Sequence, residues 1–300
     1  MTRKVILLFG ADGQLGRELA NELRRLYDLR CYRRADVDLR DDVSTRQAIR
    51  HVAPDIIVNA AAYTAVDRAE SDAEVAYAVN AVAPAVMAEE ASRTGAMIVH
   101  YSTDYVFSGT KDGAYLEDDA TEPLSVYGRS KLAGEEAVRL IGGRSAIVRT
   151  TWVFGREGTN FLKTILKLAA DRDALSVVDD QVGAPTPADW ISEQTAAMIR
   201  TLESAGPADP RWGTYHVTAA GETSWHGYAQ HLVREAAALG ARLRVSADDI
   251  NPVPSSEYPT AAARPLNSRL SCEKFATTFG VELPDWRVGV GRVLKQLITQ

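Results

Sequence analysis

The feature that most constrains the fold is a short apolar run followed by a glycine-spaced loop and a helical pattern. Residues 5–9 read VILLF, the continuous apolar run of a strand covered on both faces. The next residues, GADGQLG, place Gly10, Gly13 and Gly16 three apart, and RELANELRRLY follows with a helical repeat. This order predicts a Rossmann-type turn, in which N–H groups at the start of the helix face a pyrophosphate. Three glycines alone are weak evidence, because a loop can need glycine only to turn.

Strand and helix patterns continue to alternate through the first half of the chain. Further strands are predicted at 29–33, 55–63, 96–107 and 145–155, with helices at 43–54 and 74–95. The helix at 43–54 begins with a Ser/Thr cap signal, and the one at 74–95 is interrupted by a proline. Such alternation predicts an α/β fold with a doubly wound parallel sheet, whose ligands bind beyond the carboxyl ends of the strands.

The alternation weakens after residue 155, which predicts a smaller α/β substrate-binding lobe. A helix is expected at 158–173, a strand and turn at 175–190, a strand returning to the main sheet at 214–218, and a proline-rich loop at 252–268. We therefore expect a dinucleotide-binding domain at 1–154, joined again by 182–220, and a lobe made of 155–181 and 221–300.

Composition excludes several classes of partner. The net charge of −6 and the lack of a long basic block argue against nucleic acid. No apolar run approaches membrane-spanning length. Cys31 and Cys272 are too few for a disulfide framework and suit a reducing cytoplasm. The five histidines show no metal-binding spacing, so no metal site is predicted.

The stretch SVYGRSKLAGEE at 125–136 places Tyr127 and Lys131 four residues apart. On a helix these side chains share one face. One interpretation is an ordinary amphipathic helix. The other is a proton donor beside the cation that tunes it.

The end of the second predicted strand bears on cofactor choice. An acidic residue there, such as Asp36, would bind a ribose 2′-hydroxyl, whereas Arg33 and Arg34 would hold a 2′-phosphate. We favour NADPH as the cofactor and keep NADH open. The alternative for Arg33 and Arg34 is that they are ordinary surface residues with no role in cofactor binding.

Together, several ordered motifs resemble the extended short-chain dehydrogenase/reductases and, within them, the dTDP-4-dehydrorhamnose reductase family. The resemblance spans nearly the whole chain and is carried by GADGQLG, DVDLRD, AAYTAVDRAE, STDYVFSGTKDGAYLEDD, PLSVYGRSKLAGE, RTTWVFG, DQVGAPT and RPLNSRLS. It implies reduction of a 4-keto sugar nucleotide, in the synthesis of dTDP-L-rhamnose for cell-surface polysaccharide. The substrate would be a nucleotide-sugar.

The resemblance also implies roles for residues that follow the predicted strands. Cofactor contacts would come from the glycine loop, the end of the second strand and the segments after later strands: Gly10, Gly13, Gln14, Leu15, Gly16, Arg33, Asp38, Leu39, Ala62, Tyr63, Thr64, Tyr101, Tyr127 and Lys131. Substrate contacts would come from Thr103, Asp104, Trp152, Gln181, Thr186, Arg264 and Asn267.

In this scheme Tyr127, Lys131 and Thr103 are catalytic. Tyr127 would donate a proton to the developing alkoxide, Lys131 would lower the pKa of the phenol and bond the nicotinamide ribose, and Thr103 would donate to the same carbonyl oxygen. Asp104 would tune this pair or bind a sugar hydroxyl, or else cap a turn. Structural roles remain open for three of these residues: Thr103 could be only a strand-end hydroxyl, Trp152 an ordinary core residue, and Arg264 a loop anchor.

Three rival functions share parts of this pattern. A 4,6-dehydratase would carry an acid after the aspartate that matches Asp104, where this chain has Tyr105. Epimerases share the Tyr–Lys pair, and one related protein is a non-catalytic regulatory subunit of methionine adenosyltransferase.

Some family members are thought to dimerise through magnesium held by C-terminal acids. Residues 286–300 contain no Asp or Glu, so we expect a monomer or a homodimer without that bridge.

Overall fold

The computed structural model describes residues 3–299 and contains the predicted parallel sheet. All five pairings between neighbouring strands of the six-stranded sheet are parallel, in the order β10-β5-β4-β3-β1-β2. The strands are β1 (Val5–Phe9), β2 (Asp28–Tyr32), β3 (Ile56–Asn59), β4 (Met97–Thr103), β5 (Ser145–Thr150) and β10 (Gly213–His216). Strand β10 pairs with β5, which confirms that the chain returns to the sheet near residue 214.

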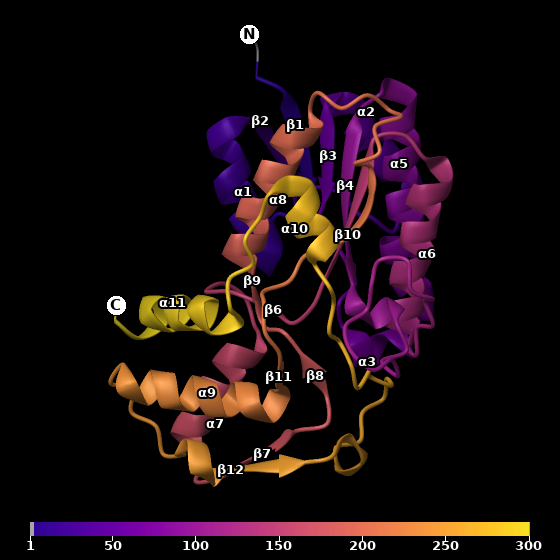
Figure 1. Ribbon diagram of the computed structural model, residues 1–300. Coiled ribbons are helices and arrows are strands. Elements are labelled where there is room, and N and C mark those ends of the chain that lie inside the picture. The colour runs from indigo at the N-terminus through magenta and orange to yellow at the C-terminus, as the bar shows by residue number, and fades with distance from the viewer. Residues whose placement is uncertain (1–2, 300) are drawn as a thin grey trace.

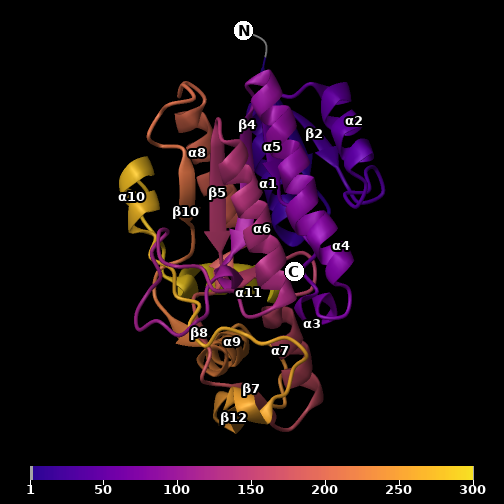
Figure 2. The same ribbon diagram turned by 90° about the vertical axis from the view of Figure 1, so that its right-hand side faces the viewer.

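Helices cover both faces of the sheet, as Figures 1 and 2 show. One face carries α1 (Gln14–Leu26), α8 (Ala188–Leu202) and α10 (Glu273–Phe279), and the other carries α2 (Asp42–Val52), α5 (Ala83–Thr94) and α6 (Val126–Ile141). A separate apolar core fills each layer between sheet and helices. The continuous apolar strands of the sequence are therefore buried on both sides, as a doubly wound sheet requires.

Two local details differ from the sequence-based expectations. The cap of α2 is Asp41, whose side chain accepts from the N–H of Val43, and not a serine or threonine. The predicted helix at 74–95 consists of α4 (Ala73–Tyr77), a π-helix η1 (Ala78–Val82) and α5. The proline lies in the first turn of α5, where its missing N–H costs nothing, so the irregularity falls on the π-helix before it.

The remaining elements build a smaller lobe below the carboxyl ends of the sheet strands (Figure 1). It contains α7 (Phe161–Asp171), α9 (Trp225–Ala238), α11 (Trp286–Ile298), β7 (Leu175–Val178) and β12 (Ile250–Val253). Two short pairings of two-residue strands complete it: β6 (Val153–Phe154) with β9 (Thr186–Pro187), and β8 (Val182–Gly183) with β11 (Thr223–Ser224). The lobe has its own apolar core, with Phe154, Tyr228 and Trp286 among its largest side chains.

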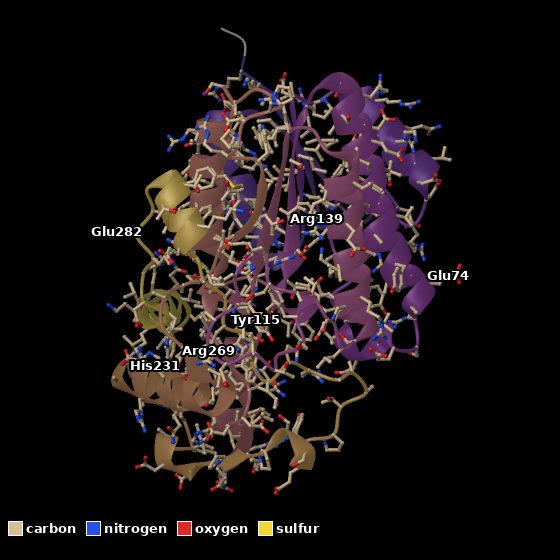
Figure 3. All side chains as sticks on the ribbon, turned by 45° about the vertical axis from the view of Figure 1, so that its right-hand side comes forward. Glu74, Tyr115, Arg139, His231, Arg269 and Glu282 are labelled. Atoms are coloured by element: carbon tan, nitrogen blue, oxygen red, sulfur yellow. The ribbon has the colours of Figure 1, made fainter. Side chains whose placement is uncertain are left out.

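The division into domains stays a prediction. Helix α10 lies within the stretch 221–300 assigned to the lobe, yet Phe275 of this helix packs in the core beneath the sheet. Tyr115 and Arg269 lie near each other in Figure 3, and the N–H of Tyr115 donates to the carbonyl of Arg269 at 2.8 Å. No helix within residues 3–299 combines the length and apolarity needed to cross a bilayer.

Candidate active site

The glycine loop brings β1, α1 and β3 into close contact. Gly10 has φ +82°, and a Cβ there would lie 2.5 Å from the nitrogen of Ala61 after β3. A Cβ at Gly16 would overlap the carbonyl oxygen of Gly10. Gly13 is the N-cap of α1, and it offers no side-chain acceptor to the first turn. The loop is therefore a tight glycine-dependent turn, as predicted.

This cradle fits a dinucleotide pyrophosphate. The first turn of α1 carries no acidic residue, and no side chain caps its N–H groups. Such a helix start attracts phosphate oxygens. Gln14 adds a link to the lobe, since its side-chain amide donates to the carbonyl of Val153 at 2.8 Å and accepts from Asn160 at 2.7 Å. Leu15, beside it, packs partly buried against the core.

At the end of β2, the predicted 2′-phosphate site is held by ion pairs. Arg33 is exposed and its Nε lies 3.3 Å from a carboxylate oxygen of Asp12 in the glycine loop. Asp36 turns back to accept from the N–H of Arg33 at 2.9 Å. Asp38 is paired with Arg40, and this contact lowers the pKa of Asp38 to about 2. An arginine thus stands beside the glycine loop, where a ribose phosphate would lie.

Tyr127 reaches the end of β4 because α6 approaches very closely. Ser125 caps α6 by accepting from the N–H of Gly128 at 3.2 Å. A Cβ at Gly128 would overlap the carbonyl oxygen of Tyr105, so only glycine allows this approach. The ring of Tyr127 then packs edge-on against Tyr105, with centroids 5.4 Å apart. The helix start is built to place Tyr127 next to the residues that follow β4.

Lys131 lies one turn further along α6 and is 2% exposed. Its Nζ donates to the carbonyl oxygen of Tyr101 on β4 at 2.6 Å. Burial lowers the pKa of Lys131 to about 8, while the charge of Glu135 opposes that fall. The side chain of Tyr101 instead points into the core, where its hydroxyl bonds Thr195 of α8. Tyr101 therefore contributes its carbonyl to the site rather than its ring.

Thr103 ends β4, Asp104 begins the short 3-10 helix that follows, and both are buried. The hydroxyl of Thr103 donates to Asp104 at 2.9 Å and accepts from the N–H of Tyr105 at 3.2 Å. Burial raises the pKa of Asp104 to about 6, opposed by the side chains of Ser268, Thr103 and Thr151. A hydroxyl group has one proton. Thr103 can therefore donate to a substrate carbonyl only after it releases Asp104.

The structure does not show the lowered pKa that was expected for the phenol of Tyr127. Burial raises the pKa of Tyr127 to about 12; Thr103 lowers it and the charge of Asp104 raises it. The ammonium of Lys131 is directed at the carbonyl of Tyr101. The prediction that Lys131 makes this phenol acidic is wrong for the structure as it stands, because desolvation and the charge of Asp104 both raise the pKa of Tyr127 and Lys131 is not among the groups that lower it.

Asn80 is a site residue that sequence reasoning missed. It lies in the π-helix, is fully buried, and its Oδ1 accepts from the N–H of Tyr63 at 2.8 Å. Its Nδ2 donates to the carbonyl of Tyr63 and to Ser130, whose hydroxyl donates to the carbonyl of Tyr127. Asn80 thus ties the loop after β3 to α6, the helix that carries Tyr127 and Lys131. A lone amide in the apolar run AYAVNAVAP was the available signal.

The loop after β3 holds the other predicted nicotinamide-side residues. Ala62 and Tyr63 are partly buried, and Thr64 is exposed. The hydroxyl of Tyr63 donates to Asp72 at 2.9 Å. Leu39, predicted at the adenine end, packs partly buried against the core on the α2 and α5 side.

The predicted substrate residues divide into two groups. Trp152 follows β5, and Gln181 donates to Ser255 at 3.1 Å, so both lie on the lobe side of the sheet. Arg264 pairs with Asp67 at 2.7 Å, the loop-anchoring contact that the sequence left open.

Thr186 and Asn267 have structural bonds. The hydroxyl of Thr186 donates to the carbonyl of Ala184, and the amide of Asn267 donates to two carbonyls of the loop 111–113. Both side chains are buried, so their bonding capacity is already used within the lobe junction. Within residues 3–299, no group of three or more His, Cys, Asp or Glu side chains could hold a metal ion.

Comparison with known proteins decides the family. A family model described as the RmlD substrate binding domain matches residues 3–299. The chain is 46% identical over 297 residues to a dTDP-4-dehydrorhamnose reductase of Burkholderia thailandensis, covering 98% of this chain and 99% of the relative.

The chain belongs to the dTDP-4-dehydrorhamnose reductase family.

A second member of this family, from Escherichia coli K12, is 45% identical over 298 residues and covers 98% of both chains. The fold agrees as well. A crystal structure of dTDP-4-dehydrorhamnose reductase from Bacillus anthracis, in complex with NADP, superposes with a TM-score of 0.89. That protein is 33% identical, with 98% of this chain and 100% of that chain covered. The family resemblance in the sequence motifs is thereby confirmed, and so is the fold class.

Proposed function

We propose that this protein reduces the 4-keto group of dTDP-4-dehydro-L-rhamnose to give dTDP-L-rhamnose, with hydride from NAD(P)H and a proton from Tyr127. The observation that carries the proposal is the convergence of Tyr127, Lys131 and Thr103 at the end of β4, beside a glycine loop that fits a pyrophosphate. Membership of the dTDP-4-dehydrorhamnose reductase family supports the substrate.

The residues divide the work of the reaction. A bound reduced nicotinamide supplies the hydride. Tyr127 stays protonated at neutral pH because its pKa is about 12, so it is ready to donate to the oxygen of the carbonyl being reduced. Lys131, held by the carbonyl of Tyr101, would bond the ribose hydroxyls and favour the phenolate that remains after proton transfer. Thr103 would donate to the same oxygen once it turns from Asp104.

We propose NADPH as the cofactor and keep NADH as the alternative. Arg33 stands beside the glycine loop and presents a charged fork that suits a 2′-phosphate. The B. anthracis relative is described in complex with NADP. For the substrate, we propose contacts from Asp104, Trp152, Gln181 and Arg264 and treat Thr186 and Asn267 as supports of the loops around them.

The decisive experiment supplies dTDP-4-dehydro-L-rhamnose with NADPH or NADH and follows both cofactor absorbance and product. We expect one cofactor oxidised for each dTDP-L-rhamnose formed. Inversion at C4 without cofactor oxidation would assign an epimerase instead. Binding of NADPH with no turnover of this sugar or of other nucleotide-linked 4-keto-6-deoxy sugars would favour a regulatory subunit. A UDP-linked substrate run in parallel tests recognition of the base.

We also propose a cytoplasmic location and a monomer or homodimer. Both cysteines are free, and Asp189 next to the C-terminal helix is paired with Arg292 at 2.7 Å. Size-exclusion chromatography with and without magnesium checks the assembly, and an unchanged elution volume is expected.

A further inference from the structure

Trp152 has a backbone conformation that bulky residues avoid. It follows β5, and its φ is +46°, in the left-handed region. Among residues 3–299 the other such non-glycine residue is Ala53, which ends a helix. A left-handed conformation is strained for a tryptophan and persists only where its surroundings hold it in place. The strained backbone of Trp152 implies that contacts with neighbouring residues hold it in this conformation.

Trp225 is the main contact that fixes it. The two indole rings stack with centroids 3.6 Å apart and an interplanar angle of 14°. Trp225 begins α9 in the lobe, so the stack joins the end of a sheet strand to the lobe. Helix α9 starts at a firm position, because its cap Ser224 accepts from the N–H of Gly227 and belongs to the β8–β11 pair.

Gly183 is a second close neighbour of the Trp152 indole. A Cβ at Gly183 would lie 2.8 Å from Cε2 of Trp152 and 3.2 Å from Cβ of Ser268. Gly183 belongs to β8, which pairs with β11 directly before Trp225. The β8–β11 pair and the start of α9 that follows it therefore supply both contacts that fix Trp152.

These contacts lie beside the catalytic residues. Ser268, next to Gly183, and Thr151, next to Trp152, both act on the carboxyl group of Asp104. Asp104 in turn accepts from Thr103 at 2.9 Å. The indole of Trp152 is partly exposed, so it is available to a ligand at the ends of β4 and β5.

We propose that Trp225 is a positioning residue for sugar binding: by stacking on Trp152, it holds that indole as a fixed wall for the apolar face of the hexose. This inference rests on the proposed function, because it needs a sugar at the end of β4. It adds a residue from the lobe that makes no contact with the reacting atoms and acts through Trp152. An indole already fixed loses little freedom when the sugar binds.

The stack has its own spectroscopic signal. Two indoles in contact couple their electronic transitions and give a paired band in far-ultraviolet circular dichroism. We expect this band in the unaltered protein, and its loss in Trp225→Leu, Trp225→Phe and Trp152→Phe. Phe161→Leu is the matched control, because the Phe161 ring packs 4.5 Å from Trp225 but is not part of the indole pair. This control should keep the band.

The kinetic expectation separates positioning from general packing. Trp225→Leu should raise KM for the sugar nucleotide about tenfold, with kcat and NADPH affinity changed less than about threefold. Trp225→Phe retains a ring and should recover most of that loss. Gly183→Ala, whose methyl group would clash with the indole of Trp152, should also raise KM. Phe161→Leu should leave KM within about twofold.

The outcomes are distinguishable. An unchanged KM in Trp225→Leu with the band lost would overturn the inference and leave the proposed function standing. An equal rise in KM in Trp225→Leu and Phe161→Leu would also overturn the inference, because the effect would then come from general core packing. No turnover in the unaltered protein would overturn the proposed function and, with it, this inference. If Trp225→Leu does not fold, Trp225→Met takes its place: a lost band with a raised KM supports the inference, and a lost band with an unchanged KM overturns it.

Discussion

The ammonium group of Lys131 donates a 2.6 Å hydrogen bond to the main-chain carbonyl of Tyr101, two residues before Thr103 on β4. This bond holds a buried cation whose pKa is lowered to about 8. The cation is therefore present below pH 8 and is lost as pH rises through that value. The catalytic site should depend on this charge.

We expect kcat/KM to fall on the basic side of about pH 8 as Lys131 loses its proton. Lys131→Arg would keep its charge throughout the accessible range, because guanidinium does not titrate there. The variant should be slower but should lack this basic limb. The measurement is a pH profile of kcat/KM for both proteins, and a limb that persists unchanged in Lys131→Arg would remove Lys131 from the explanation.

Asp104 predicts a pH dependence of stability. Its pKa is raised from 3.8 to about 6 by burial, so its contribution to stability is fully present below pH 4 and is lost as pH rises through 6. By linkage, up to about 3 kcal/mol is involved. Asp104→Asn should therefore gain stability relative to the unaltered protein between pH 4 and 7. Denaturant unfolding at several pH values measures this difference, and a constant difference would contradict the assigned pKa.

Gly128 predicts a loss of catalysis without a loss of cofactor binding. Gly128→Ala would force α6 away from the carbonyl of Tyr105 and displace Tyr127. Misplacement of a catalytic group by about 1 Å costs about 100-fold in rate, which we expect in kcat. NADPH affinity, measured by cofactor fluorescence, should change little. Gly291→Ala is the control, because its Cβ meets no atom within 4 Å, and it should retain full activity.

Arg33 predicts the choice between the two cofactors. Arg33→Ala removes the cation beside Asp12 and should weaken NADPH binding by about tenfold, while NADH binding changes little. Arg30→Ala, at an exposed arginine within β2, is the matched control. Titrations with both cofactors provide the comparison. Equal losses for NADPH and NADH would show that Arg33 does not read the 2′-phosphate.

The sequence predicted those features that follow from local chemistry. Glycines spaced after a buried strand marked the tight turn, and the i, i+4 spacing placed Tyr127 and Lys131 on one helix face. Both are present in the structure, together with the parallel sheet. The family motifs added the substrate class, which no periodicity can show.

Features that depend on distant contacts were not predictable from pattern. The π-helix and the bonds of Asn80 to Tyr63 and Ser130 need residues 17 and 50 positions away. The direction of the pKa shift of Tyr127 was wrong because desolvation depends on the whole fold. The stack of Trp152 on Trp225 joins two residues far apart in the chain, and no spacing rule reports it.

The most direct test of the account is the rate of carbonyl reduction in Tyr127→Phe, measured with dTDP-4-dehydro-L-rhamnose and NADPH at neutral pH. Removing the proton donor should lower kcat by a factor of about 100 to 10,000, while the fold and NADPH affinity are retained. A variant that reduces the sugar at the rate of the unaltered protein would contradict the account, because the proton would then come from another group.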